Sequence, residues 1–282
     1  MAWTDTTRKQ YRRDGLRYPT DLRDHEYDWI ANYLPPQKNR MGRPRRCCLR
    51  EVVNAVFYCL RTGCPWRFLP KEFPRWKTVY TYYRRWLHQG LWQKIHDVLH
   101  RHMRQRSGKK PCPKAAIIDS QSVKTTESGG PRGFNVCKQT KGRNRHIMVD
   151  TQGLLIVCQV QTANTQDRDG GVPVAAAAKK KFPSLRHVWA DGGYQGPLFA
   201  AAFAAIAKWK LEIVKRTDPR IKNPASKSDK KCFTPLPRRW VVERTFGWLN
   251  RNRRLSRDYE KNPIHSQTYC FIAMIALMLR RL

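Results

Sequence analysis

Acidic residues are scarce in this chain of 282 residues. There are 21 Asp and Glu against 56 Lys and Arg, which gives a formal net charge of +35 at pH 7. That excess is far beyond what solubility requires of a protein of this size, and it predicts a polyanionic partner. Hydrophobic residues still make up 40% of the chain, with ten Trp, eleven Tyr and ten Phe. This content excludes a merely disordered basic tail and places the charge on a folded body.

Long uncharged apolar segments are also missing. The best candidate, YCFIAMIALM at residues 269–278, is too short to span a bilayer and is followed by LRRL. The N-terminal residues do not have the pattern of a secretory signal peptide. The sequence therefore predicts no membrane partner.

The nine cysteines lack the spacing of a zinc site or a disulfide framework. They are odd in number and scattered, and no C-x-x-C pair or suitably spaced His accompanies them. We expect reduced thiols. Cys47 with Cys48, or Cys59 with Cys64, could bind a soft metal, but Cys59 lies in the apolar run VVNAVFYCL, which favours packing in a core.

The first part of the chain has a helical pattern. Residues 1–20 are polar, basic and aperiodic, which predicts a flexible arm. Apolar residues at helical spacing, with Gly and Pro as breakers, then predict helices near 20–34, 50–62, 77–89 and 91–106. We therefore expect a small all-helical domain at 21–106, followed by a Gly/Pro/Lys-rich linker at 107–114.

The second part has short apolar runs typical of strands. These predict strands at 115–119, 145–150, 153–162, 185–191 and 211–217, with an alanine-rich helix at 197–210 before the last of them. A basic, proline-punctuated insertion is expected near 217–237, then an amphipathic basic helix at 238–255 and a buried apolar helix at 265–282. Residues 115–282 thus have the pattern of an α/β fold with a mixed sheet flanked by helices.

Three carboxylates are candidates for a site. Asp119 and Asp191 each end a predicted strand and precede small residues, which places them at a sheet edge that a ligand can approach. Glu243 lies on the basic helix, with Arg239 one turn before it. The alternatives are structural: Asp119 can cap a turn, and Glu243 can make an exposed ion pair worth under about 1 kcal/mol.

The sequence resembles the bacterial DDE transposases, and most closely the insertion-sequence-five family, from about residue 20 to the end. The resemblance is carried by GRPRR, LREVVNAVFYCLRTGCPWRFLP, FPRWKTVYTYYRRW, IIDSQSVK, KGRNRHIMVDTQGLL, WADGGYQG and RWVVERTFGWLNRNRRL. It implies a ribonuclease H-like core in which Asp119, Asp191 and Glu243 are the catalytic residues and metal ligands. Two Mg²⁺ ions per site, replaceable by Mn²⁺, are implied as cofactors, with Asp119 between them.

One signature of related transposases is incomplete here. The family pattern places Tyr, Arg, Glu and Lys around the glutamate, and Arg239 and Glu243 match it. Leu236 stands at the Tyr position and Asn250 at the Lys position, so contacts to the transposon end differ at these two places. Nearby arginines could supply the charge.

The front domain is expected to recognise DNA. Residues 64–86 resemble a helix-turn-helix, and GRPRR at 42–46 resembles a short minor-groove arm. A basic helix that is merely solvated is the alternative. The residues expected to contact DNA are Arg43, Arg45, Arg75, Lys77, Thr78, Thr81, Tyr82, Arg85, Arg143, Arg145, Arg239, Asn250, Arg251, Arg253 and Arg254.

The resemblance therefore implies a DNA transposase that binds terminal inverted repeats and catalyses metal-dependent cleavage and strand transfer. The expected partners are double-stranded DNA and further copies of the chain, in the bacterial cytoplasm at the nucleoid. Two alternatives remain: a nuclease on the same fold that does not join ends, and a DNA-binding regulator whose carboxylates are structural.

Overall fold

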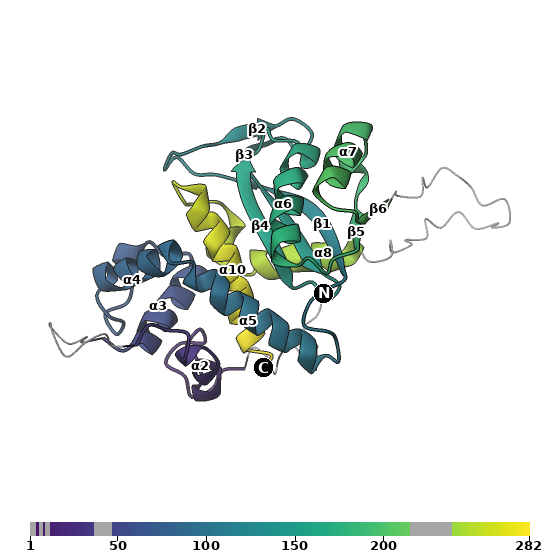
Figure 1. The fold of residues 1–282 in the computed structure, drawn as a ribbon. Coiled ribbons are helices and arrows are strands. Elements are labelled where there is room, and N and C mark those ends of the chain that lie inside the picture. Colours follow the sequence, from purple (N-terminus) through teal and green to yellow (C-terminus); the bar gives the residue numbers. More distant parts are fainter. Residues whose placement is uncertain (1–3, 6–7, 9–11, 37–46, 215–238) are drawn as a thin grey trace, which may run out of the picture. The chain divides into compact units, whose positions relative to one another are not determined.

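The computed structural model describes residues 4–5, 8, 12–36, 47–214 and 239–282. The expected minor-groove arm with Arg43 and Arg45, and the basic insertion at 217–237, lie outside these residues. The chain forms two compact units (Figure 1). The helical unit is Met1–Pro111, Val123–Pro131 and Trp248–Leu282, and the sheet unit is Cys112–Ser122 and Arg132–Gly247.

The helices of the first unit lie close to where the sequence predicts them. Gly63 and Gly90 have positive φ (74° and 65°), so they allow the chain to turn after α3 and before α5. The helical elements are α2 (Asp24–Ala31), α3 (Leu49–Thr62), η1 (Trp66–Phe68), α4 (Trp76–His88), α5 (Leu91–Arg106), α9 (Arg253–Ser256) and α10 (Pro263–Leu279).

The C-terminal helix differs from the expected domain division. The sequence assigned everything after residue 114 to the α/β domain, whereas residues 248–282 belong to the helical unit. The reason is the composition of α10, which is buried at every position from Tyr269 to Ile275 and packs against α5 and α3. A helix that is apolar nearly all round must be buried, and here α5 and α3 cover α10.

The expected flexible arm is wrong for residues 12–20. The Arg13 guanidinium is buried and pairs with the equally buried Glu26 carboxylate, with Nη2 2.7 Å from Oε2. Arg17 contacts the carboxylates of Asp21 (3.2 Å) and Glu51 (2.7 Å). The basic side chains of this segment therefore fix it to the helical unit.

Six strands form one mixed sheet in the second unit. The order is β2-β3-β1-β5-β6, and β4 pairs with β3. β5 is parallel to β1 and to β6, while β3 is antiparallel to β2 and β4. The strands are β1 (Ala115–Lys124), β2 (Gly133–Asn135), β3 (Thr140–Asp150), β4 (Leu155–Thr162), β5 (His187–Ala190) and β6 (Lys210–Ile213). The expected mixed α/β architecture is confirmed.

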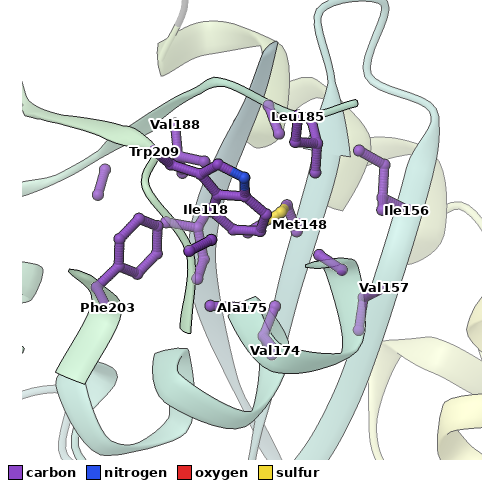
Figure 2. Close-up of a cluster of buried hydrophobic side chains, with 14 of the residues drawn as sticks. Ile118, Met148, Ile156, Val157, Val174, Ala175, Leu185, Val188, Phe203 and Trp209 are labelled. Atoms are coloured by element: carbon purple, nitrogen blue, oxygen red, sulfur yellow. The ribbon is translucent and has the colours of Figure 1, made fainter. Parts of the chain in front are cut away.

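Helices α6 (Asp167–Lys181) and α7 (Pro197–Ile206) cover one face of the sheet (Figure 1). Figure 2 shows the core between them and the strands, where Val174 and Ala175 of α6 and Phe203 of α7 join Ile118 and Met148. The sequence analysis did not identify α6, because Gly170, Gly171 and Pro173 interrupt its helical pattern.

The two glycines of α6 have a packing reason. A Cβ atom at Gly170 would lie 2.3 Å from the His146 ring of β3, and one at Gly171 would lie 2.8 Å from the Tyr194 ring. The helix therefore lies too close to its neighbours for any side chain at these positions. Among the helices of the described residues, none is long and apolar enough to cross a membrane.

Candidate active site

Asp119 and Asp191 lie at matching positions of two adjacent strands. β1 and β5 are parallel, and their register pairs Ile117 with Trp189. Each aspartate follows two residues later, so both side chains leave the sheet on the face of Ile117 and Trp189. β1 continues to Lys124, so Asp119 lies within the strand instead of ending it, whereas Asp191 directly follows β5.

The backbone at both aspartates holds the carboxylates in place. The Ser120 N–H donates to Asp119 Oδ1 at 2.7 Å, and the Gly193 N–H donates to Asp191 Oδ1 at 2.9 Å. Asp191 thereby caps the 3₁₀ turn η2 (Gly192–Tyr194). These hydrogen bonds orient the acids without neutralising them.

The electrostatic environment of Asp119 is unusual. Burial raises the pKa of its carboxyl group to about 7, and repulsion from Asp191 adds to this effect. The Ser120 hydrogen bond and the charges of Arg239 and Lys138 act in the opposite direction but do not cancel it. A partly buried pair of carboxylates of this kind favours a bound cation.

Glu243, the third acid, is linked to Asp191 by the guanidinium of Arg239. Arg239 and Glu243 lie one turn apart on α8 (Arg239–Asn250), with Arg239 Nε 3.6 Å from Glu243 Oε1. The same guanidinium lies 3.5 Å from Asp191 Oδ2 through Nη2. Arg239 therefore bridges the second and third acids, while Val242 of α8 and Ile117 border a small pocket that includes Asp119 and Asp191.

The donor set suits a hard divalent cation, because all three side chains offer carboxylate oxygens. Arg239, whose guanidinium lies near the carboxylates of both Asp191 and Glu243, shows that positive charge gathers at these acids. In the described part of the chain, no three His, Cys, Asp or Glu residues are already grouped tightly enough to hold an ion. The Glu243 side chain is 57% exposed and is held by Arg239.

A second polar cluster borders the aspartates and was missed from the sequence. The Ser120 hydroxyl donates to Asp167 Oδ1, and Lys138 Nζ lies 3.0 Å from Ser120 Oγ and 3.7 Å from Asp167 Oδ2. Asp167 begins α6, and Lys138 lies between β2 and β3. The sequence signal for Asp167 would have been an acid in the first turn of a helix that follows a strand. The sequence analysis did not identify that helix, α6, and so did not select Asp167.

Tyr194 is a further residue of this region that sequence reasoning did not select. Its side chain is fully buried, and its hydroxyl has no hydrogen-bond partner among the described residues. Burial raises its pKa well above the usual value, and the charges of Asp119, Asp167 and Asp191 add to the shift. Tyr194 therefore stays a neutral hydrogen-bond donor next to three acids.

The helical unit presents most of the expected DNA-contacting residues of α4. Arg75, Lys77, Thr81 and Arg85 are exposed, whereas Thr78 and Tyr82 are half-buried. The opposite face of the helix packs inward. The sequence analysis missed two exposed basic residues on α4, Arg84 and His88.

The expected helix-turn-helix within residues 64–86 is wrong in form. That stretch contains one α-helix, α4, preceded only by the three-residue turn η1. The helix before it, α3, ends at Thr62, so the connection to Trp76 is much longer than the three or four residues typical of the motif. Three prolines in this connection, at 65, 70 and 74, account for its irregular path.

Three of the expected DNA-contacting arginines are buried. Arg143 and Arg145 on β3 are fully buried, so the expectation that they are exposed DNA contacts is wrong. Arg254 is also buried, and its Nη2 lies 2.7 Å from Glu260 Oε1. Asn250, Arg251 and Arg253 are exposed, as DNA contacts require.

Comparisons with known proteins agree with this arrangement. A family model described as "Transposase DDE domain" matches residues 110–279, and one described as "Putative transposase of IS4/5 family" matches residues 22–96. The chain is 29% identical over 116 residues to "Insertion element IS402 uncharacterized 16.2 kDa protein" of Burkholderia cepacia, an alignment covering 39% of this chain and 77% of that protein. No solved structure matched the chain.

The first of these matches spans more than half of the chain and contains Asp119, Asp191 and Glu243. It covers the mixed sheet with its flanking helices, which is the ribonuclease H-like architecture that the DDE domain implies. The chain therefore belongs to the transposase family with a DDE domain.

Proposed function

We propose that the chain is the transposase of an insertion sequence, which binds the terminal inverted repeats and catalyses metal-dependent DNA cleavage and strand transfer. The observation that carries the proposal is the juxtaposition of acids in the sheet unit. Asp119 and Asp191 follow paired positions of parallel strands, and Arg239 links Asp191 to Glu243 of α8. The family membership supplies the reaction class.

Asp119, Asp191 and Glu243 would hold the metal. Carboxylate oxygens are the ligands that Mg²⁺ and Mn²⁺ prefer, and the family resemblance implies two such ions. When bound, such ions activate the attacking oxygen and stabilise the leaving oxygen of a phosphodiester. The protein contributes the carboxylates, and Ile117, Trp189 and Val242 line the small pocket at Asp119 and Asp191 with apolar side chains.

Arg239 has two roles in this proposal. Without metal, its guanidinium neutralises Asp191 and Glu243. When the carboxylates of Asp191 and Glu243 bind metal, the guanidinium becomes available to a DNA phosphate. It can bind that phosphate through two parallel hydrogen bonds. It thus both protects the empty acids from mutual repulsion and orients the substrate.

Recognition of DNA ends is assigned to the helical unit. Exposed polar residues of α4 lie on one face, where the cations Lys77 and Arg85 flank Thr81 at intervals of four residues. Such a helix can enter the major groove while arginines beyond α8 contact phosphates. Double-stranded DNA is the partner that the family and the charge of +35 both favour.

Transposition joins two DNA ends, so we expect a dimer or larger assembly on DNA, in the bacterial cytoplasm at the nucleoid. The cleavage and strand-transfer assay below depends neither on the oligomeric state nor on the location in the cell. A non-joining nuclease and a catalytically inactive regulator are the competing functions, and the same experiment separates them.

The test uses purified protein with DNA carrying both ends of the element that encodes it. Nicking and strand transfer are scored separately in Mg²⁺. We expect both products, and we expect Asp119→Asn, Asp191→Asn and Glu243→Gln each to abolish them while end binding persists. Asp169→Asn is the matched control, because it removes an exposed carboxylate of the same unit. Nicking without transfer would favour the nuclease, and tight binding without any product would favour the regulator.

A further inference from the structure

The acids of the site have a neighbour that the triad does not include. A Cβ atom at Gly193 would lie 3.0 Å from Asp191 Oδ1 and 3.2 Å from Asp167 Oδ2. The two carboxylates therefore border the same small space, which stays open because residue 193 is glycine. A charge bound at Asp191 must be felt at Asp167, since screening is weak over such a short, partly buried distance.

The position of Asp167 is fixed from two sides. Asn144 of β3 donates through Nδ2 to the carbonyl oxygens of Ala163 (3.2 Å) and Thr165 (2.8 Å), and so holds the segment that leads into α6. The buried Ser120 hydroxyl then donates to Asp167 directly. A carboxylate that only stabilised the N-terminus of α6 through the helix dipole would not need the Ser120 hydrogen bond or the Asn144 hydrogen bonds that hold its segment.

Lys138 is held against the same carboxylate by the loop between β2 and β3. Asn135 Oδ1 accepts the Lys138 N–H at 2.9 Å, and a Cβ atom at Gly133 would collide with Asn164 Oδ1, 2.1 Å away. Strand β2 therefore lies tightly against the segment before α6, and from the loop that follows β2 the Lys138 ammonium reaches both Ser120 and Asp167. The charge of Lys138 also lowers the pKa of Asp119.

We propose that Asp167 is a positioning residue of the metal site, whose negative charge strengthens cation binding by Asp119 and Asp191, and that Lys138 is its counterion and weakens that binding. This inference rests on the proposed function, because it assumes that Asp119 and Asp191 bind the ion. It makes opposite predictions for two residues in contact with each other. Loss of the acid weakens cation binding, and loss of the lysine strengthens it.

The experiment measures Mn²⁺ binding to the full chain without DNA at pH 8, from the electron paramagnetic resonance signal of free Mn²⁺. We expect Asp167→Asn to weaken binding by about tenfold, the lower end of the effect of losing a polar group next to metal ligands. We expect Lys138→Gln to tighten binding severalfold. Asp169→Asn is the matched control, because it removes the same charge from the same first turn of α6 at an exposed position, and it should bind like the unmodified protein.

Three results would overturn the inference: unchanged binding by Asp167→Asn, equal weakening by Asp167→Asn and Asp169→Asn, or weakening by Lys138→Gln. Thermal unfolding of each variant in chelator checks that the fold is kept. If Asp167→Asn does not fold, the Mn²⁺ affinity of Lys138→Gln still tests the inference, because the inference requires that affinity to increase. Asp119→Asn and Asp191→Asn test the underlying site separately, since normal Mn²⁺ binding by both would refute the proposed metal site and not merely the role of Asp167.

Discussion

Arg254 gives the sharpest test of how the structure differs from the sequence-based expectation. The sequence places it among exposed DNA-contacting arginines, whereas the structure buries it in the helical unit. Its Nε and Nη2 both lie 2.7 Å from Glu260 Oε1, and Nη1 donates to the Cys64 carbonyl at 3.0 Å. The guanidinium also lies 4.7 Å from the Tyr269 ring centre. We expect Arg254→Ala to destabilise the fold.

The size of the effect follows from burial. The side chains of Arg254 and Glu260 are only 8% and 13% exposed. Removing one partner of a buried ion pair costs about 3–5 kcal/mol, because the other charge stays buried without compensation. The denaturant slope grows with chain length, and at the upper end of its usual range, about 3 kcal/mol per M of urea, the unfolding midpoint should fall by roughly 1–2 M. Since folded proteins are stable by about 5–15 kcal/mol, the variant should still fold in the cold.

The matched control is Arg253→Ala, which removes the same side chain from an exposed position of the same short helix. Its midpoint should change little, while its affinity for DNA should fall. Urea unfolding followed by circular dichroism, and DNA binding at 4 °C, give both readouts. A change in midpoint for Arg254→Ala no larger than that for Arg253→Ala would refute the reasoning, and so would a pure loss of DNA affinity.

Three further outcomes are expected. Arg239→Lys should slow single-turnover cleavage at saturating protein more than it weakens end binding, because lysine cannot bind phosphate bidentately; unchanged cleavage would leave Arg239 a structural counterion only. Arg85→Ala should weaken DNA binding and reduce the slope of log K against log salt by about 0.9, and an unchanged slope would remove α4 from the interface. The nearby Cys59 thiol, with Sγ atoms 3.7 Å apart, lowers the pKa of Cys64 to about 6, so its alkylation by iodoacetamide should rise with pH and be half-maximal near pH 6. A Cys64 profile that keeps rising up to about pH 8.5, as for an ordinary thiol, would contradict the shift.

The central acids of the site could be predicted because local patterns mark them. Asp119 and Asp191 follow apolar runs, and parallel pairing of those runs brings the two acids to one edge. Arg239 and Glu243 are one helical turn apart, so their contact follows from helix geometry alone. The sequence could not show that the Arg239 guanidinium also contacts Asp191, because that contact joins two segments distant in sequence.

The missed features depend on contacts between distant segments. Gly170 and Gly171 weaken the local helix pattern of α6, and only the close approach of His146 and Tyr194 explains them. The burial of Arg143, Arg145 and Arg254 was missed because arginine is usually exposed, and only the packing of the folded chain shows otherwise. Asp167 could not be assigned to the site while the helix that it begins was unidentified.

The scarcity of acids acquires a physical meaning in the sheet unit. With so few carboxylates in a chain of net charge +35, those of the site do not stand alone: Arg239 contacts Asp191 and Glu243, and Lys138 contacts Asp167. These cations compensate the acids where no metal is bound. Under the proposed function, Asp191 and Glu243 would release Arg239 when they bind an ion, and a DNA phosphate would then give Arg239 a new partner. Each ligand then removes part of the cost of binding the other, and this coupling is necessarily reciprocal. A basic chain can in this way keep its metal site weak until DNA is present.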